Sequence, residues 1–266
     1  WLKLQTISAR RDLHNHLPTR SLLQSSWMSN NMMEVESSNA PKLNESLGAV
    51  DREVRSGFVR KVYGILSAQL VLTTLIALPI QLNPEWVIMH RSVAQVAMFA
   101  SIGLVVGVGC CCQQVARTYP YNYVFLLLVT VCESVIVGFI SAMYTTQSVL
   151  MMMALTAGIF LGLTFYAMTT KTDFTGMGGY LSAGLMCLFL TSFLMIFFPS
   201  PLGQKLLAGF GALLFSGYIV YDTQMIMGDK HQQKFGIDDY VFAALNIYLD
   251  IINLFLYLLS LFGERR

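Results

Sequence analysis

Residues 240–263 read YVFAALNIYLDIINLFLYLLSLFG, an apolar run interrupted by a single carboxylate, Asp250. About 20 consecutive apolar residues are needed to cross the hydrocarbon core of a bilayer as a helix. Hydrocarbon offers the backbone no hydrogen-bond partners, and the run is about twice as long as a strand of a membrane barrel. The segment is therefore predicted to be a transmembrane helix that carries an acid in its middle.

Six further apolar runs, separated by short polar stretches, meet the same length criterion. Together the predicted spans cover residues 58–80, 93–112, 121–141, 148–168, 178–198, 206–227 and 240–263. The predicted fold class is therefore an all-α polytopic membrane protein, built as a seven-helix bundle.

The composition of the chain agrees with membrane insertion. Hydrophobic residues make up 55% of the sequence and charged residues only 12%, whereas a soluble domain averages about 25% charged. The mean hydropathy is +0.58. The net charge is only +2 and the basic residues are scattered, so nucleic-acid binding is not expected. The five cysteines contain no Cys-x-x-Cys pair, which argues against zinc and against a disulfide framework.

Three parts are expected along the chain. Residues 1–57 are polar, rich in Ser and Asn, and lack sustained apolar periodicity, which predicts a disordered cytosolic tail. Residues 58–263 form the membrane domain, and residues 264–266 form a short C-terminal tail. Because the chain opens on Trp1 and not on Met, the native start of the N-terminal tail is left open.

The distribution of basic residues predicts the orientation. In a seven-span topology most of the Lys and Arg residues fall on the side of the N-terminal tail, which the positive-inside rule places in the cytosol. Arg265 and Arg266 fall on the opposite side. They favour an alternative with six spans plus a last segment that re-enters the membrane and turns back.

Only three carboxylates lie well inside predicted spans, namely Glu133, Asp222 and Asp250. An aspartate at the centre of a membrane helix costs roughly 2.5 to 3.5 kcal/mol on insertion scales, so each acid needs a compensating role. One possibility is structural, with a protonated acid hydrogen-bonded to a neighbouring Tyr or Asn. The other is an ion or proton pathway.

Asp222 and Asp250 are expected to form a pair. They lie about 9 Å and 15 Å from the loop between the last two helices, which places them within about one turn of each other if these helices pack antiparallel. Two carboxyls in a dry site cannot both ionise cheaply, so the pair should titrate as one pH-sensitive unit. Two carboxylates fall short of the six to eight oxygens that calcium prefers, which predicts transient calcium binding.

Polar neighbours surround this predicted pair. Asn246 and Asn253 precede and follow Asp250 by four and three residues, so all three lie on one helix face. Tyr218 and Thr223 offer hydroxyl groups to Asp222 or to water.

Two further groups could take part in an ion path. Thr130 and Ser134 could bind Glu133. Arg117 could pair with a deprotonated aspartate and act as a latch that closes the path until protonation frees it.

Several segments resemble the transmembrane Bax-inhibitor-motif family, also known as lifeguard or Golgi anti-apoptotic proteins. They are FVRKVYGILSAQL at 58–70, YPYNYVFLLL at 119–128, KTDF at 171–174, GALLFSGYIVYDTQ at 211–224 and DDYVFAALNIYLDIINLFLYLL at 238–259. The resemblance runs in order from about Phe58 to Gly263. It implies a seven-helix fold whose last helix is central, and an aspartyl dyad that maps onto Asp222 and Asp250.

The resemblance also implies a function. It suggests a pH-sensitive calcium leak that lowers store calcium and confers resistance to apoptosis, in the Golgi or endoplasmic reticulum. The plasma membrane and the mitochondrial membrane are the alternative locations. No enzymatic activity and no cofactor are expected, and calcium is the permeant ion. The expected partners are the lipid bilayer and apoptosis-regulating membrane proteins. A basic latch of bacterial relatives falls nearest Arg117, and an acid of some relatives is replaced by Gln95.

Three other functions remain open at this point. The chain could be a non-conducting scaffold that acts by binding partners, or a proton-coupled transporter. Tyr221-Asp222 also resembles one motif of the intramembrane aspartyl proteases, but Asp250 lacks the Gly-x-Gly-Asp context of their second aspartate.

Overall fold

The protein is described by a computed structural model covering residues 19–110, 117–228 and 233–266. The described part is helical, and its only β-type pairing is an isolated bridge between Tyr144 and Arg265. The chain divides into two compact units, residues 1–54 and residues 55–266. The predicted all-α fold class is confirmed.

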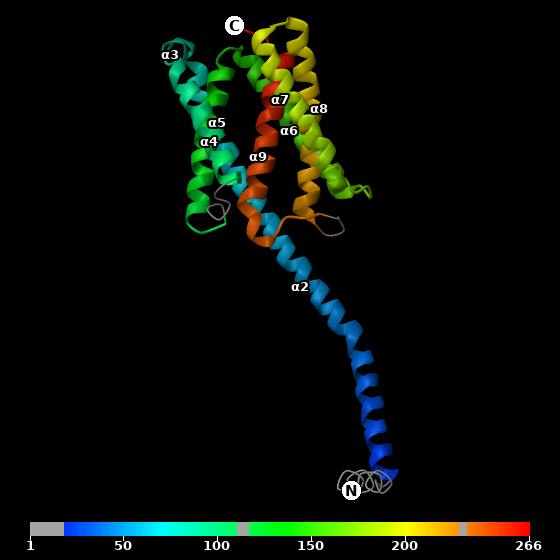
Figure 1. Cartoon of the computed structure of the whole chain (residues 1–266). Helices are drawn as coiled ribbons and strands as arrows, with labels where there is room; N and C mark the ends of the chain where they lie inside the picture. Colours follow the sequence, from blue (N-terminus) through cyan, green and yellow to red (C-terminus); the bar gives the residue numbers. More distant parts are fainter. Residues whose placement is uncertain (1–18, 111–116, 229–232) are drawn as a thin grey trace, which may run out of the picture. The chain divides into compact units, whose positions relative to one another are not determined.

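The helices follow one another through short connections (Figure 1). The long helices are α2 (Thr19–Leu82), α4 (Arg91–Cys110), α5 (Tyr121–Ser141), α6 (Thr146–Thr169), α7 (Gly178–Phe197), α8 (Pro201–Met227) and α9 (Tyr240–Phe262). The short ones are α3 (Pro84–Met89) and the 3₁₀ turns η1 (Thr175–Met177) and η2 (Ile237–Asp239).

Six of these helices are long and apolar enough to cross a membrane, counted over the described residues. They are segments of α2 and α5 to α9, and α4 adds a shorter apolar stretch, Arg91–Gly107. The end of the second predicted span, at Cys112, lies outside the described residues. The protein is thus an integral membrane protein whose helices match the seven predicted segments.

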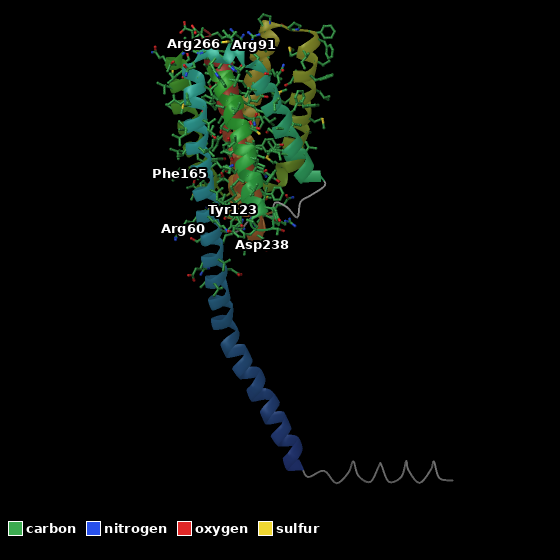
Figure 2. The ribbon with its side chains drawn as sticks, turned by 90° about the vertical axis from the view of Figure 1, so that its left-hand side faces the viewer. Arg60, Arg91, Tyr123, Phe165, Asp238 and Arg266 are labelled. Atoms are coloured by element: carbon green, nitrogen blue, oxygen red, sulfur yellow. The ribbon has the colours of Figure 1, made fainter. Side chains whose placement is uncertain are left out.

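The last helix crosses the bundle without turning back. α9 is unbroken from Tyr240 to Phe262, so the alternative with a re-entrant last segment is wrong. Figure 2 shows the result: Arg91 and Arg266 lie at one end of the bundle, while Arg60 and Asp238 lie at the other. The long apolar run favours a full crossing more than the two terminal arginines oppose it.

α9 is also the most enclosed span. Two thirds of its most apolar window, 67%, is buried, against 6% for α7. It contacts α5, α6 and α8, and Figure 1 shows it standing between the α4–α5 pair and the helices α6 to α8. The central last helix that the family resemblance implies is therefore present, and it positions Asp250 in the interior.

One boundary differs clearly from the sequence prediction. α8 begins at Pro201, whereas the predicted span begins at residue 206. The Ser200 side chain caps the helix by accepting a hydrogen bond from the Gly203 N–H group at 3.3 Å. Proline fits the first helical position because its missing N–H would be unpaired there anyway. Pro201 therefore starts α8, in addition to following the end of α7.

The N-terminal segment is helical from Thr19 onward, where the sequence predicts a disordered tail up to residue 57. Residues 1–18 lie outside the described part. Two glycines, Gly48 and Gly57, lie within this helix between Pro41 and the apolar span. A long polar helix draws little stability from packing, and local propensity alone is a weak force. Disorder of this segment in solution stays a prediction.

Candidate functional site

The site is built where α8 and α9 pack against each other. α8 ends at Gly228, whose left-handed backbone (φ 62°) suits glycine and turns the chain out of the helix. Higher in the same interface, a Cβ atom on Gly211 would lie 2.8 Å from the Tyr257 ring of α9. The absence of a side chain at Gly211 thus lets the two helices approach closely and brings their acids together.

Asp222 of α8 and Asp250 of α9 form a buried pair. The residues are only 3% and 6% exposed, and their carboxyl groups share a side-chain hydrogen bond. No other group of the described chain donates a hydrogen bond to the buried Oδ2 atom of Asp250. The geometric expectation of a pair at one level of the bundle agrees with this arrangement.

A hydrogen bond between two carboxyl groups requires at least one proton, because a carboxylate only accepts. Removing that proton would place two negative charges side by side in a site with little water, which is costly. The pair can therefore exist in a proton-sharing state and, at higher pH, in a charged state that needs a counter-ion or water.

Hydroxyl groups from three helices face one another in the interior, and a further tyrosine lies near the pair. The Tyr63 hydroxyl of α2 faces Thr164 of α6 and Thr223 of α8, and all three oxygens are buried without a well-formed hydrogen bond. Tyr218 of α8 lies close enough to both carboxyl groups to interact with them electrostatically. Buried polar oxygens without a well-formed hydrogen bond are the kind of group that an ordered water satisfies.

The asparagines of α9 do not bind the pair directly. Asn253 donates to the Leu249 carbonyl of its own helix at 2.8 Å, and Asn246 is half-buried one turn before Asp250. Among the described hydrogen bonds, none joins either asparagine to Asp222 or Asp250. They lie on the polar side of α9 without completing the carboxyl pair.

Glu133 belongs to a different polar cluster. The Ser101 hydroxyl of α4 donates to its Oε1 atom, and the residue faces α4. Thr130 and Ser134, which the sequence offered as partners for Glu133, donate instead to carbonyl groups of their own helix. The structure therefore does not bring Glu133 together with the aspartate pair.

Arg117 lies at the end of the bundle where α9 begins. Its Nε atom is 2.8 Å from Oδ1 of Asp239, the residue that precedes α9. The Arg117 side chain is 54% exposed, so this ion pair contributes little to stability by itself. In this structure the expected latch residue contacts Asp239 and neither aspartate of the pair.

Comparisons with known proteins identify the family. A family model described as inhibitor of apoptosis-promoting Bax1 matches residues 55–266. Protein lifeguard 4 of Mus musculus is 40% identical over 210 residues, covering 78% of this chain and 84% of that protein. The chain belongs to this Bax inhibitor family. Bax inhibitor 1 of Schizosaccharomyces pombe is 36% identical over 216 residues (80% and 78% coverage), and a BI1-like protein of Arabidopsis thaliana is 38% identical over 218 residues (80% and 83%).

Arg55 is a residue at the start of the membrane domain whose role the sequence did not predict. Its guanidinium donates to three carbonyl oxygens, those of Met225 (2.6 Å), Phe235 (2.8 Å) and Met227 (3.1 Å). These carbonyls lie at the end of α8 and in the segment before α9. Arg55 thus ties the start of the membrane domain to the connection between the two helices that carry the pair.

Gln224 was missed as well. Its Oε1 atom accepts from the Phe174 N–H group at 2.7 Å, and its Nε2 atom donates to the Thr172 carbonyl at 2.9 Å. This fully buried amide holds the KTDF segment between α6 and α7 against α8. The YDTQ motif therefore supplies a carboxyl group for the pair and an amide for the neighbouring loop.

The pair is not a preformed metal cage. In the part of the chain that the structure describes, no group of three or more His, Cys, Asp or Glu residues could hold a metal ion together. Two carboxyl groups supply at most part of a calcium shell. Any cation at Asp222 and Asp250 would complete its coordination with water or hydroxyl oxygens.

Proposed function

We propose that the chain is a pH-sensitive calcium leak of an intracellular membrane that lowers the calcium content of the store and restrains apoptosis. The Golgi and the endoplasmic reticulum are the proposed locations, with the N-terminus in the cytosol. The observation that carries this proposal is the buried hydrogen-bonded pair of Asp222 and Asp250 on adjacent helices. The names of the relatives, lifeguard and Bax inhibitor, support the link with apoptosis.

The proposed gate responds to charge. While the pair retains a proton, Arg117 stays on Asp239 and Arg55 stays on the carbonyls of the α8–α9 connection. Loss of the proton creates an extra negative charge in a medium of low dielectric constant, where it attracts a guanidinium strongly. A basic residue drawn toward the pair would close the path. The leak is therefore expected to be faster at acidic pH than at neutral pH.

Two arginines compete for the role of latch. Arg117 is the residue that the sequence suggests, but Asp239 lies about 16 Å along α9 from Asp250. Arg55 binds the Met225 carbonyl, about one helical turn from Asp222. Arg117→Gln and Arg55→Gln separate these possibilities, because only the latch variant should keep a fast leak at neutral pH.

Calcium efflux from loaded liposomes tests the proposal. Wild-type protein should release calcium faster at acidic pH, and Asp222→Asn or Asp250→Asn should release it at a high rate that no longer depends on pH, since asparagine stays neutral. Asp238→Asn is the matched control, because it removes an exposed acid outside the pair and should behave as wild type.

Other results would favour the other functions. Efflux equal to that of empty liposomes at every pH, with correctly folded protein, would support a non-conducting scaffold. Proton-driven uptake that saturates with a substrate would indicate a transporter. Cleavage of a transmembrane reporter that stops in both Asn variants would indicate an aspartyl protease.

A further inference from the structure

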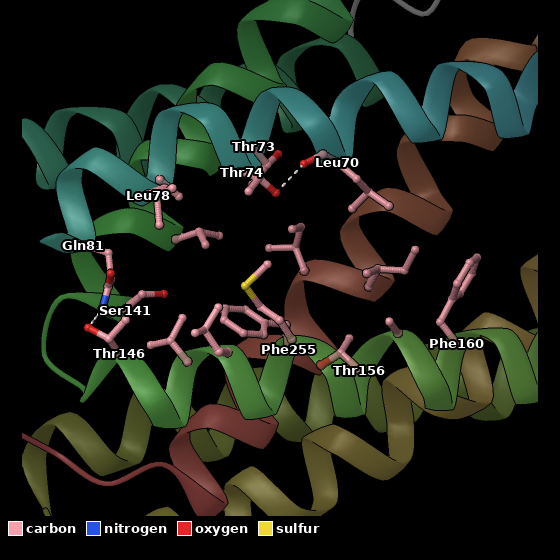
Figure 3. A pocket seen from close by; sticks show the side chains of 18 residues that line it. Leu70, Thr73, Thr74, Leu78, Gln81, Ser141, Thr146, Thr156, Phe160 and Phe255 are labelled. Atoms are coloured by element: carbon pink, nitrogen blue, oxygen red, sulfur yellow. Dashed lines mark hydrogen bonds between the residues drawn. The ribbon is translucent and has the colours of Figure 1, made fainter.

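A cavity of about 370 Å³ lies on another side of the central helix. Its walls come from α2, α5, α6 and α9 (Figure 3), and most of them are apolar. Typical wall residues are Leu70, Ala77, Met153, Phe160, Ile252 and Phe255. The volume falls in the range of small-molecule sites, roughly 300–1,000 Å³. Neither Asp222 nor Asp250 lines this cavity, so it is separate from the proposed gate.

The cavity opens toward the lipid between α2 and α6. Leu78 on α2 and Leu150 on α6 both line it, and they are 48% and 57% exposed. The lining residues on α2 run from Leu70 to Gln81, which corresponds to roughly 16 Å along the helix axis. The cavity is therefore a long apolar slot that a molecule in the bilayer can enter from the side.

One end of the slot is polar, as Figure 3 shows for Gln81, Ser141 and Thr146. The Gln81 Nε2 atom donates to Thr146 at 3.1 Å, whereas its Oε1 atom is buried with no partner among the described residues. The Ser141 hydroxyl is likewise buried without a partner. Both residues are only 2% exposed. Buried polar atoms without partners are rare and costly, and they indicate that a polar group of a ligand belongs there.

A positively charged side chain, that of Arg266, lies at the same end of the slot. Arg266 donates from Nη2 to the Thr146 hydroxyl at 2.9 Å, and its backbone N–H binds the Met143 carbonyl at 3.0 Å. Arg265 lies over the Tyr144 ring instead. Glu264 is the acid of the same short tail. An anionic group at the mouth of the slot would find a guanidinium there.

We propose that the slot binds one acyl chain of an anionic phospholipid whose headgroup carries a hydroxyl. The chain lies between α2 and α6, the phosphate accepts hydrogen bonds from Arg266, and the headgroup hydroxyl donates to Gln81. The charge favours a phospholipid over a sterol, which has a hydroxyl group but no anionic group. The lipid comes from the leaflet at the end of the bundle where α2 ends and α6 begins.

Photo-crosslinking in vesicles tests this site. Phosphatidylglycerol and phosphatidylcholine, each with a photoreactive group on one acyl chain, are compared with a photoreactive sterol, and labelled peptides are mapped by mass spectrometry. Labelling of residues 70–81 and 149–160 is measured relative to the lipid-facing α7. Phosphatidylglycerol should label the slot about five-fold more than phosphatidylcholine, the effect of about 1 kcal/mol of attraction to one arginine.

Two pairs of variants make the result specific. Arg266→Gln should remove the preference for phosphatidylglycerol, and Arg265→Gln, which removes the same charge from the same tail, should keep it. Ala157→Phe fills the slot and should abolish its labelling, whereas Ala154→Phe, on the same helix but outside the lining, should not. Stronger labelling by the sterol, equal labelling of the slot and of α7, or equal effects of both arginine variants would overturn the proposal.

Discussion

In the proposed gate, a proton shared by Asp222 and Asp250 joins two helices at a point where water has little access. A neutral pair of this kind costs less in the membrane than two separate charged aspartates. It also leaves one acceptor, Oδ2 of Asp250, without a donor. On the proposed mechanism, the site is stable while it holds a proton and attracts cations strongly when it loses one.

Arg55 should stabilise the connection between these two helices. Arg55→Ala removes three hydrogen bonds made by a charged group to backbone carbonyls, and such a bond is worth about 1.5 to 3 kcal/mol. Hydrogen exchange of residues 233–239 should accelerate markedly in this variant. Arg52→Ala is the control, since Arg52 is an exposed basic residue on the same helix. Equal exchange in both variants would show that Arg55 does not hold the connection.

Individual site residues differ in how far sequence predicts them. Asp222 and Asp250 are predictable because a carboxylate in an apolar run is rare, and because helix rise fixes its depth. Arg55 is not, since its partners lie about 170 residues further along the chain. Glu133 carries the same sequence signal as the aspartates, but it lies on α5 and its carboxyl group binds Ser101 of α4.

At the scale of elements, close packing of α8 on α9 is what creates the pair. Gly211→Leu should force the two helices apart, because its Cβ atom would lie 2.8 Å from the Tyr257 ring. Overpacking of this kind costs typically 1–3 kcal/mol. Gly209→Leu on the same helix has open space within 4 Å and serves as the control. Thermal unfolding in detergent should therefore begin at a lower temperature only in Gly211→Leu. Equal unfolding midpoints for Gly211→Leu and Gly209→Leu would contradict this packing.

The positions of the long helices can be predicted from the lengths of the apolar runs. The exact residues at which the helices begin and end cannot always be predicted in this way. The limits of α5 were predicted without error, because Pro120 and the polar stretch before it bound the run. α3 was not predicted, since six residues are too short for a membrane signal. The start of α8 was misplaced because a proline can end one helix and open the next.

At the scale of the whole molecule, the orientation in the membrane can be tested with single cysteines. His90→Cys and Thr172→Cys place thiols in exposed positions at loops predicted to face opposite sides. In sealed vesicles with the cytosolic face outward, a membrane-impermeant maleimide should label Thr172→Cys at once and His90→Cys only after permeabilisation. The unmodified chain gives the background from native cysteines. The reverse pattern would place the N-terminus on the non-cytosolic side.

The bundle as a whole could be predicted as all-α from hydropathy, while the central place of α9 required the family resemblance. α9 differs from the other spans in the larger buried share of its apolar window, 67%, and an apolar run looks alike in sequence whether lipid or protein surrounds it. For the same reason the lipid-facing slot between α2 and α6 has no signature in the sequence. It exists only through the spacing of four helices.

The ratio of calcium efflux rates at acidic and neutral pH, in liposomes that contain either the wild type or Asp250→Asn, tests the central claim most directly. The account predicts a ratio well above one for the wild type and close to one for Asp250→Asn, with Asp238→Asn like the wild type. A variant that leaks and keeps the wild-type ratio would show that the aspartate pair is not the pH-sensitive gate.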